Sequence, residues 1–84
     1  MKKASLKTPA RQIFASNLRR YRRVREISQD ALALKASMSR SYVSGIERGE
    51  RNVSIDNMGV LADALGVALK DLVDPDLFSS VDKR

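Results

Sequence analysis

The sequence has 84 residues, of which 43% are hydrophobic, and this size allows one small domain with a single core. It contains no Cys and no His, which excludes the usual zinc, haem and thiol sites and also Ser–His and Cys–His catalytic pairs. No apolar run approaches the ~20 residues of a membrane span, and the N-terminal residues lack the apolar segment of a signal peptide. We therefore expect a cytoplasmic, non-enzymatic protein that holds no metal or other cofactor.

The net charge of +6 is divided unevenly along the chain. Residues 1–51 hold thirteen Lys and Arg residues against four acids, whereas residues 52–84 hold three against six, so the two segments carry +9 and −3. A surface that faces phosphates and an opposite surface that faces protein would produce this polarity. A basic face is also common on helices that contact only solvent, so the charge alone does not identify a partner.

Three segments are expected along the chain, with one folded unit in the middle. Residues 1–8 are polar, basic and without apolar periodicity, which predicts a mobile arm. Residues 9–74 show helical periodicity, and residues 75–84 are expected to form a short C-terminal tail. Because no stretch alternates apolar and polar residues for long enough to predict a strand, the expected fold is all-α, a compact bundle of five short helices.

The first two helices are predicted from their caps and apolar faces. Thr8 is expected as a cap and Pro9 as the first residue of a helix that runs to about Arg25, because the missing N–H of proline costs nothing there. Ser28 caps a second helix that ends near Ala36. The apolar face of the first helix comprises Ala10, Phe14, Leu18 and Tyr21.

A short break over residues 37–39 separates the second helix from a third. Ser39 is the expected cap of the third helix, which is predicted to run from Arg40 to about Arg48, and Gly49 is its natural C-terminal stop. Two short helices joined by a turn of this length form the general pattern of a helix-turn-helix.

Two further helices are predicted in the acidic half of the chain. Ser54 caps the fourth helix, which ends at Gly66. Its apolar stripe is Ile55, Met58, Leu61, Ala62 and Leu65, and the apolar set of the fifth helix is Leu69, Leu72 and Val73. Asp74 and Pro75 end the fifth helix and start a further turn.

The second and third helices are expected to pack together and to leave a polar outer face on the third. The inner set is Leu32, Ala33, Ala36, Met38, Val43 and Ile46. The outer set is Arg40, Ser41, Ser44, Gly45 and Arg48. Arginine reaches guanine edges, serine bonds to any base, and Gly45 either allows close approach to a groove or marks a weak helix. The outer face therefore has the composition of a surface that reads base pairs.

The block SQDALALKASMSRSYVSGIERGERNVS resembles the Cro-like phage-repressor, or xenobiotic-response-element, family of regulators. Within that family, SRSYVSGIERGERN is most similar to the controller proteins of bacterial restriction-modification systems. The resemblance covers about residues 11–73. It implies a lambda-repressor-like domain of five helices that binds double-stranded DNA, as a homodimer on operators with inverted symmetry.

The resemblance also implies roles for individual residues. Candidates for base contacts are Arg40, Ser41 and Ser44, and candidates for phosphate contacts are Gln29, Tyr42, Arg48, Arg51 and Asn52. The free N–H groups at a helix N-terminus agree with a phosphate role for Gln29. Arg22 and Glu47 are placed together as a partly buried ion pair between the first and third helices.

Two positions depart from the pattern of the family. Ser37 stands in the turn where the family usually has glycine, so a side chain occupies a backbone position that favours positive φ, and a cost or a different turn is expected. Ala68 stands where a Ser, Thr or Pro usually begins the fifth helix, so the first turn of that helix lacks a side-chain cap.

A second copy of the chain is an expected partner, because one short recognition helix contacts too few base pairs to select one operator in a genome. The predicted dimer interface consists of the apolar residues left over after the core is filled, Leu69, Val73, Leu77 and Phe78. The alternative is that these residues complete the core of the monomer. No small-molecule effector is expected, because the sequence offers no second domain to bind one.

Two other functions stay open from the sequence. One is an antitoxin-type regulator, in which the tail from Asp74 to Arg84 wraps a protein partner while the basic half binds DNA. The other is a basic amphipathic domain that binds RNA or anionic membranes without sequence preference. Aromatic residues make up only 5% of the chain, which argues against a stacking platform for single strands.

Overall fold

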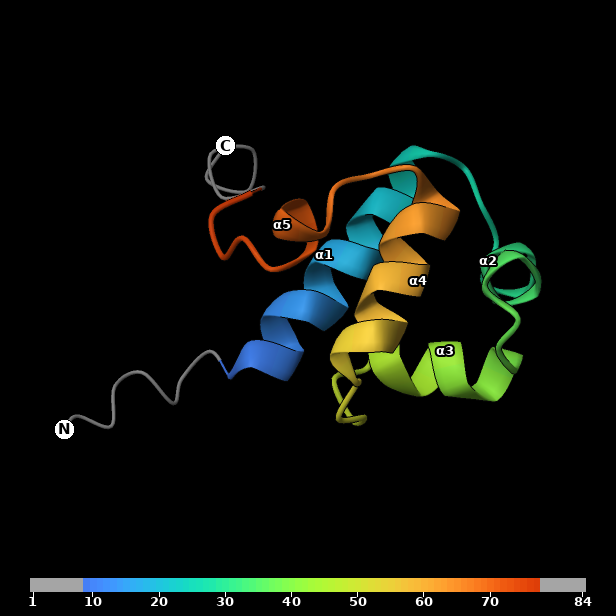
Figure 1. Ribbon diagram of the computed structural model, residues 1–84, viewed down its shortest axis with the longest axis horizontal. Helices are drawn as coiled ribbons and strands as arrows, with labels where there is room; N and C mark the ends of the chain where they lie inside the picture. The colour runs from blue at the N-terminus through green and yellow to red at the C-terminus, as the bar shows by residue number, and fades with distance from the viewer. Residues whose placement is uncertain (1–8, 78–84) are drawn as a thin grey trace, which may run out of the picture.

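The computed structural model describes residues 9–77, and within that range it contains five α-helices and no strand (Figure 1). The helices are α1 (Ala10–Val24), α2 (Gln29–Ala36), α3 (Arg40–Glu47), α4 (Ile55–Leu65) and α5 (Leu69–Leu72). The predicted all-α fold is therefore confirmed for the described residues, while the predicted arm over residues 1–8 lies outside them. None of these helices has the length and apolar character needed to cross a membrane.

Serine side chains cap the N-termini of three helices, as predicted. In each case the Oγ atom accepts a hydrogen bond of 3.0–3.1 Å from the backbone N–H three residues later. The capped pairs are Ser28 with Ala31, Ser39 with Tyr42, and Ser54 with Asn57. Each bond satisfies one of the N–H groups that the first turn of a helix leaves without a partner, so the helix starts follow from the local sequence.

The start of α1 differs from its prediction by one residue. Pro9 is the capping residue rather than the first helical residue, and no side chain caps the helix there. Ala68 precedes α5 without a side-chain cap, as its departure from the family pattern implied. Gly66 ends α4 in a left-handed conformation with φ of 73°, as predicted.

Within residues 9–77, two residues other than glycine have positive φ. Ser37, in the turn between α2 and α3, has φ of 57° and ψ of 43°, so the serine occupies the left-handed conformation that the family pattern implied. Glu26, in the connection between α1 and α2, has the same φ of 57°, which the sequence analysis did not anticipate. Each left-handed residue with a Cβ atom costs roughly 1–2 kcal/mol relative to a right-handed one.

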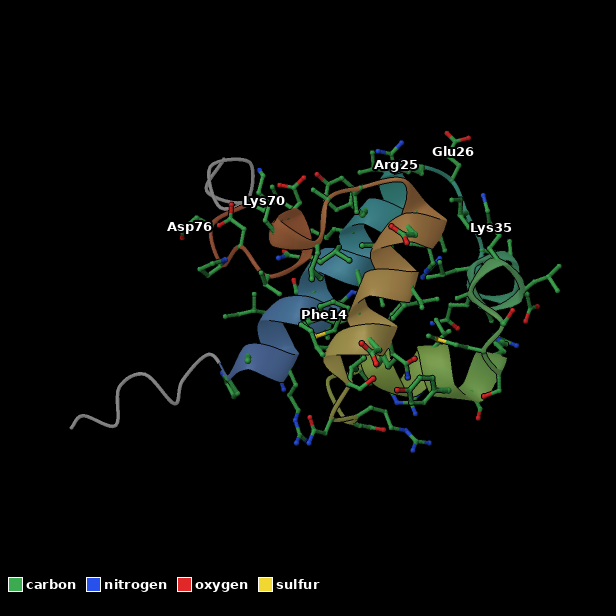
Figure 2. All side chains as sticks on the ribbon, in the orientation of Figure 1. Phe14, Arg25, Glu26, Lys35, Lys70 and Asp76 are labelled. Carbon is green, nitrogen blue, oxygen red and sulfur yellow. The ribbon has the colours of Figure 1, made fainter. Side chains whose placement is uncertain are left out.

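The core lies where α1, α2, α3 and α4 meet, with α5 packed against α1 and α4. Figure 2 shows Phe14 pointing between α1 and α4. The buried apolar side chains that form the core cluster are Phe14, Leu18, Leu32, Ala33, Ala36, Val43, Ile46, Leu61, Ala62, Leu65 and Leu72. The helix-turn-helix pair thus buries its predicted inner set, with Met38 half-buried at the turn.

Three residues predicted on apolar faces are exposed. Ala10 is exposed, and the exposed fractions of Ile55 and Val73 are 66% and 42%. Ala10 and Ile55 are the first residues of α1 and α4, and Val73 follows the last residue of α5. These apolar stripes are longer than the part of each helix that contacts the core, so the predictions were wrong at the ends of the stripes.

A buried amide on α1 holds α5 in place. Asn17 is 6% exposed, and its Nδ2 group lies 3.3, 3.2 and 2.8 Å from the backbone carbonyl oxygens of Asp71, Leu72 and Asp74, which accept hydrogen bonds from it. The carbonyl groups of Asp71 and Leu72 end a helix of only four residues, and that of Asp74 lies two residues beyond it, where intrahelical donors are absent. The Asn17 side chain therefore supplies the C-terminal cap of α5 from another helix.

Candidate nucleic-acid interface

The helix α3 runs along one edge of the molecule, at the bottom of the view in Figure 1. Its inner side is buried through Val43 and Ile46, so its other side forms part of the surface. Among the predicted DNA contacts, Arg40, Ser41, Arg48, Arg51 and Asn52 are exposed, while Gln29, Tyr42 and Ser44 are half-buried. The structure thus places the predicted base and phosphate contacts of α3 and the following loop at accessible positions.

At the N-terminal end of α3, Arg40 lies beside an acid of α2. The Arg40 Nε and Asp30 Oδ1 atoms are 3.6 Å apart, with side-chain exposures of 64% and 76%. An ion pair at such exposure contributes at most about 1 kcal/mol. Loss of this contact would therefore cost little, and Ser41 beside Arg40 is also exposed.

At the C-terminal end of α3, Arg48 is engaged by two neighbours. Its guanidinium donates a hydrogen bond to Ser44 Oγ and forms an ion pair with Glu50 at 3.1 Å. The hydrogen bond from Arg48 lowers the pKa of the exposed Glu50 carboxyl below its usual range, and the charge of Arg48 adds to this effect. The role of this acid was not predicted, although Glu50 stands only two residues after Arg48 in the sequence.

The loop after α3 folds back over the helix through Arg51. The Arg51 guanidinium carbon lies 5.6 Å from the centroid of the Tyr42 ring, and Asn57 of α4 donates a 3.1 Å hydrogen bond to the Tyr42 hydroxyl. Gly45 lies beneath the Arg51 side chain and is buried. The expectation that Gly45 belongs to the open outer face was therefore wrong, because helical periodicity did not reveal that a loop residue covers it.

A buried carboxylate connects α3 to α1 and α2. Arg22 Nε and Nη2 donate to the two carboxylate oxygens of Glu47 at 2.6 and 2.9 Å, and the side chains are 12% and 3% exposed. Gln29 also donates to Glu47, at 3.0 Å, while Arg19 donates to the Glu47 backbone carbonyl at 2.6 Å. A further bond of 2.9 Å runs from Arg22 to the carbonyl of Ile27.

This arrangement has two electrostatic consequences. The hydrogen bond to Glu47 raises the pKa of Arg22, and the Coulomb attraction of Glu47 acts in the same direction, against the effect of burial. The side-chain amide of Gln29, predicted as a phosphate ligand, is directed to Glu47 in the free protein. Its position at the first residue of α2 still leaves the backbone at the helix N-terminus available to an anion.

An open polar groove of about 500 Å³ lies between α1, the start of α2 and the end of α3. Its cationic walls are Arg19, Arg22, Arg23 and Arg48, and its other polar walls include Gln29 and Ser44. Glu47 and Glu50 also line the groove and pair with Arg22 and Arg48, so Arg19 and Arg23 supply its excess positive charge, which favours anions. Within residues 9–77, no cluster of three or more acidic side chains could hold a metal ion.

The predicted dimer surface is only partly available. Leu69 is half-buried and packs against the core, Val73 is exposed, and Leu77 is half-buried. Phe78 lies outside the described residues. Val60 on α4, 40% exposed, is a further exposed apolar residue that the sequence analysis assigned to no surface.

Comparison with known proteins agrees with this arrangement. Residues 18–72 match the helix-turn-helix family. Control protein C.BamHI of Bacillus amyloliquefaciens is 45% identical over 65 residues, which cover 76% of this chain and 80% of the relative. The solved structure of the hypothetical transcription factor NHTF from Neisseria superposes with a TM-score of 0.80 at 32% identity, covering 92% of this chain and 87% of that one.

A second solved structure comes from a protein with a stated role. The restriction-modification controller protein C.AhdI from Aeromonas hydrophila has a TM-score of 0.70 and 43% identity, over 71% of this chain and 91% of that chain. The family match covers more than half of the chain, and the relatives are regulators. The chain therefore belongs to the Cro-like, xenobiotic-response-element family of DNA-binding helix-turn-helix transcriptional regulators.

Proposed function

We propose that the chain is a sequence-specific transcriptional regulator of the restriction-modification controller type, which binds an inverted-repeat operator as a homodimer with α3 in the major groove of each half-site. The observation that carries this proposal is the accessible face at the start of α3. It presents Arg40 and Ser41 outside a helix-turn-helix core that is fully packed. The controller role is supported by the 45% identity to control protein C.BamHI and the 43% identity to C.AhdI.

Base reading is assigned to Arg40, Ser41 and Ser44. An arginine guanidinium forms two parallel hydrogen bonds with O6 and N7 of guanine, and a serine hydroxyl donates to or accepts from any base. Arg40 loses only an exposed contact to Asp30 when it turns to a base. Ser44 accepts from Arg48 in the free protein, so its base contact requires Arg48 to move or to bind with it.

Phosphate contacts would place α3 in the groove without carrying sequence information. The proposed contacts are Gln29, Tyr42, Arg48, Arg51 and Asn52, which flank the base-reading residues on α2, α3 and the following loop. The groove lined by Arg19 and Arg23 extends this cationic surface toward α1.

The need for two copies follows from the length of α3. Its eight residues contact only about three to five base pairs, which is too few to single out one operator. The proposed interface is formed by Leu69, Val73, Leu77 and Phe78, in the segment with the lowest positive charge. With two-fold symmetry, the two copies of α3 would lie about 34 Å apart and the half-sites would be centred about 10 base pairs apart.

Selection of bound sequences from a random duplex pool tests the proposal most directly. The expected result is one inverted repeat with half-sites at the spacing given above, bound by a species that sediments as a dimer. Equal binding to random duplex and single strands would overturn it in favour of a non-specific domain, and co-purification of a second small protein would favour the antitoxin-type regulator. A monomer that binds one half-site with full affinity would overturn the homodimer.

A further inference from the structure

We infer that Gly45 is a positioning residue for Arg51, because its bare backbone lets the arginine side chain lie across α3 in the orientation used on DNA. This inference rests on the proposed function, in which Arg51 contacts a phosphate. Gly45 itself is buried beneath the arginine and has no side chain with which to touch DNA.

A methyl group on Gly45 would require the exposed Arg51 side chain to shift from its present position. A Cβ atom built on Gly45 would lie 2.9 Å from Arg51 Nε and 3.1 Å from Arg51 Cγ, both closer than ordinary contacts. Gly45 has no positive φ, so its backbone conformation alone does not require glycine. The close approach of Arg51 is therefore the feature of this position that a side chain would disturb.

The guanidinium end of the same arginine contacts the Tyr42 ring, which is itself held by α4. The Tyr42 ring lies 5.6 Å from the guanidinium carbon, within the range of a cation–π interaction. Tyr42 and Gly45 are three residues apart on α3 and thus share a helix face. The Tyr42 hydroxyl is held by Asn57 of α4, so the ring has a fixed place relative to the core.

These contacts order a flexible side chain before DNA arrives. A free arginine loses rotamer freedom when it binds a phosphate, and this loss weakens binding. Arg51 is exposed but already lies over Tyr42 and Gly45, so part of that loss occurs on folding. Displacing it by one methyl group should therefore weaken DNA binding without removing any group that touches DNA.

The experiment compares Gly45→Ala with Gly59→Ala in the full chain. Gly59 lies in α4 and has nothing within 4 Å of a built Cβ, so it is a matched helical glycine with open space. Gly45→Ala is expected to weaken binding to the selected duplex about 2- to 10-fold per bound protomer, with equal losses on related sequences. Gly59→Ala should leave the affinity unchanged.

A double-mutant cycle with Arg51→Ala tests whether Gly45→Ala weakens DNA binding through Arg51. If Gly45 acts through Arg51, Gly45→Ala causes no further loss when Arg51 is already alanine. An equal loss in both backgrounds, or no loss in the parent protein, would overturn the inference. Failure of the parent protein to bind any duplex would instead contradict the proposed function.

NMR spectroscopy tests the geometry without DNA. The parent protein should show nuclear Overhauser effects from the Arg51 side chain to Gly45 Hα and to the Tyr42 ring, and Gly45→Ala should lose those to the ring. Asn57→Ala provides a second variant in case Gly45→Ala does not fold. It should weaken the same contacts, and because Tyr42 is itself a proposed phosphate contact, the loss of DNA affinity should become smaller, not vanish, when Arg51 is already alanine. Absence of these effects in the folded parent protein would overturn the inference.

Discussion

Two carboxylates that stand three residues apart, Glu47 at the end of α3 and Glu50 after it, have opposite surroundings. Glu47 is buried and receives three side-chain hydrogen bonds, two from Arg22 and one from Gln29. Glu50 is exposed and forms an ion pair with Arg48 at 3.1 Å. The buried charge of Glu47 thus ties α3 to α1 and α2, whereas the exposed charge of Glu50 lies on the proposed DNA-binding surface.

The largest expected effect is on folding stability. Glu47→Gln leaves the Arg22 guanidinium without its counter-charge at a site where both side chains are largely buried. Breaking such a pair costs about 3–5 kcal/mol of unfolding free energy, measurable by chemical denaturation. Glu50→Gln is the matched control and should leave the denaturation midpoint nearly unchanged. A loss under about 1 kcal/mol for Glu47→Gln would mean that the pair behaves as a surface contact.

The next effect concerns base recognition on the exposed side. Arg40→Ala should weaken binding to the selected operator by about 1–3 kcal/mol and flatten the preference at one base position. The variant should unfold at nearly the same denaturant concentration as the parent protein, because its exposed contact to Asp30 contributes little. A binding profile that keeps full preference at every position would show that Arg40 does not read a base.

Arg51→Ala should change the salt dependence of DNA binding rather than the preference at one base pair. Removing one phosphate contact from each protomer reduces the magnitude of the slope of log affinity against log salt by about 1 per bound protomer and weakens all duplex sequences alike. Titrations of operator and random duplex at several salt concentrations measure both quantities. Loss of preference at a single base pair, with the salt slope intact, would instead make Arg51 a base contact.

The smallest effect is the titration of Glu50. Because Arg48 lowers the pKa of this carboxyl in the folded protein, the pair stabilises the fold at pH above the unfolded-state pKa, and this contribution is lost as the pH falls through the folded-state pKa. Carboxyl NMR should give a midpoint below the usual glutamate range, and Arg48→Gln should move it upward. An unchanged midpoint would show that the two side chains do not interact in solution.

The sequence predicted those features of the fold that depend on neighbouring residues. The serine caps of α2, α3 and α4 follow from bonds that span three residues, so the local sequence contains both partners. The pair of Arg22 and Glu47 joins residues 25 positions apart, and only the resemblance to a family placed them together.

Other features could not be predicted because they depend on which segments meet in space. Periodicity identified the face of Gly45 on α3 but not the loop that covers it. Asn17 did give a signal, because it is a polar residue on the apolar face of α1, three residues after Phe14 and four before Tyr21. Its partners in α5 are more than fifty positions away, so the sequence alone did not reveal them.

The two contacts that α1 makes through Asn17 and Arg22 have a geometric consequence. The first fixes α5, next to the proposed dimer surface, and the second fixes the end of α3. These side chains stand five residues apart on one continuous helix. In a symmetric dimer, the separation and tilt of the two recognition helices would then be set by the rigidity of α1. The spacing of the operator half-sites would be a property of this helix, and substitutions on it could change which spacing is accepted without altering any group that touches a base.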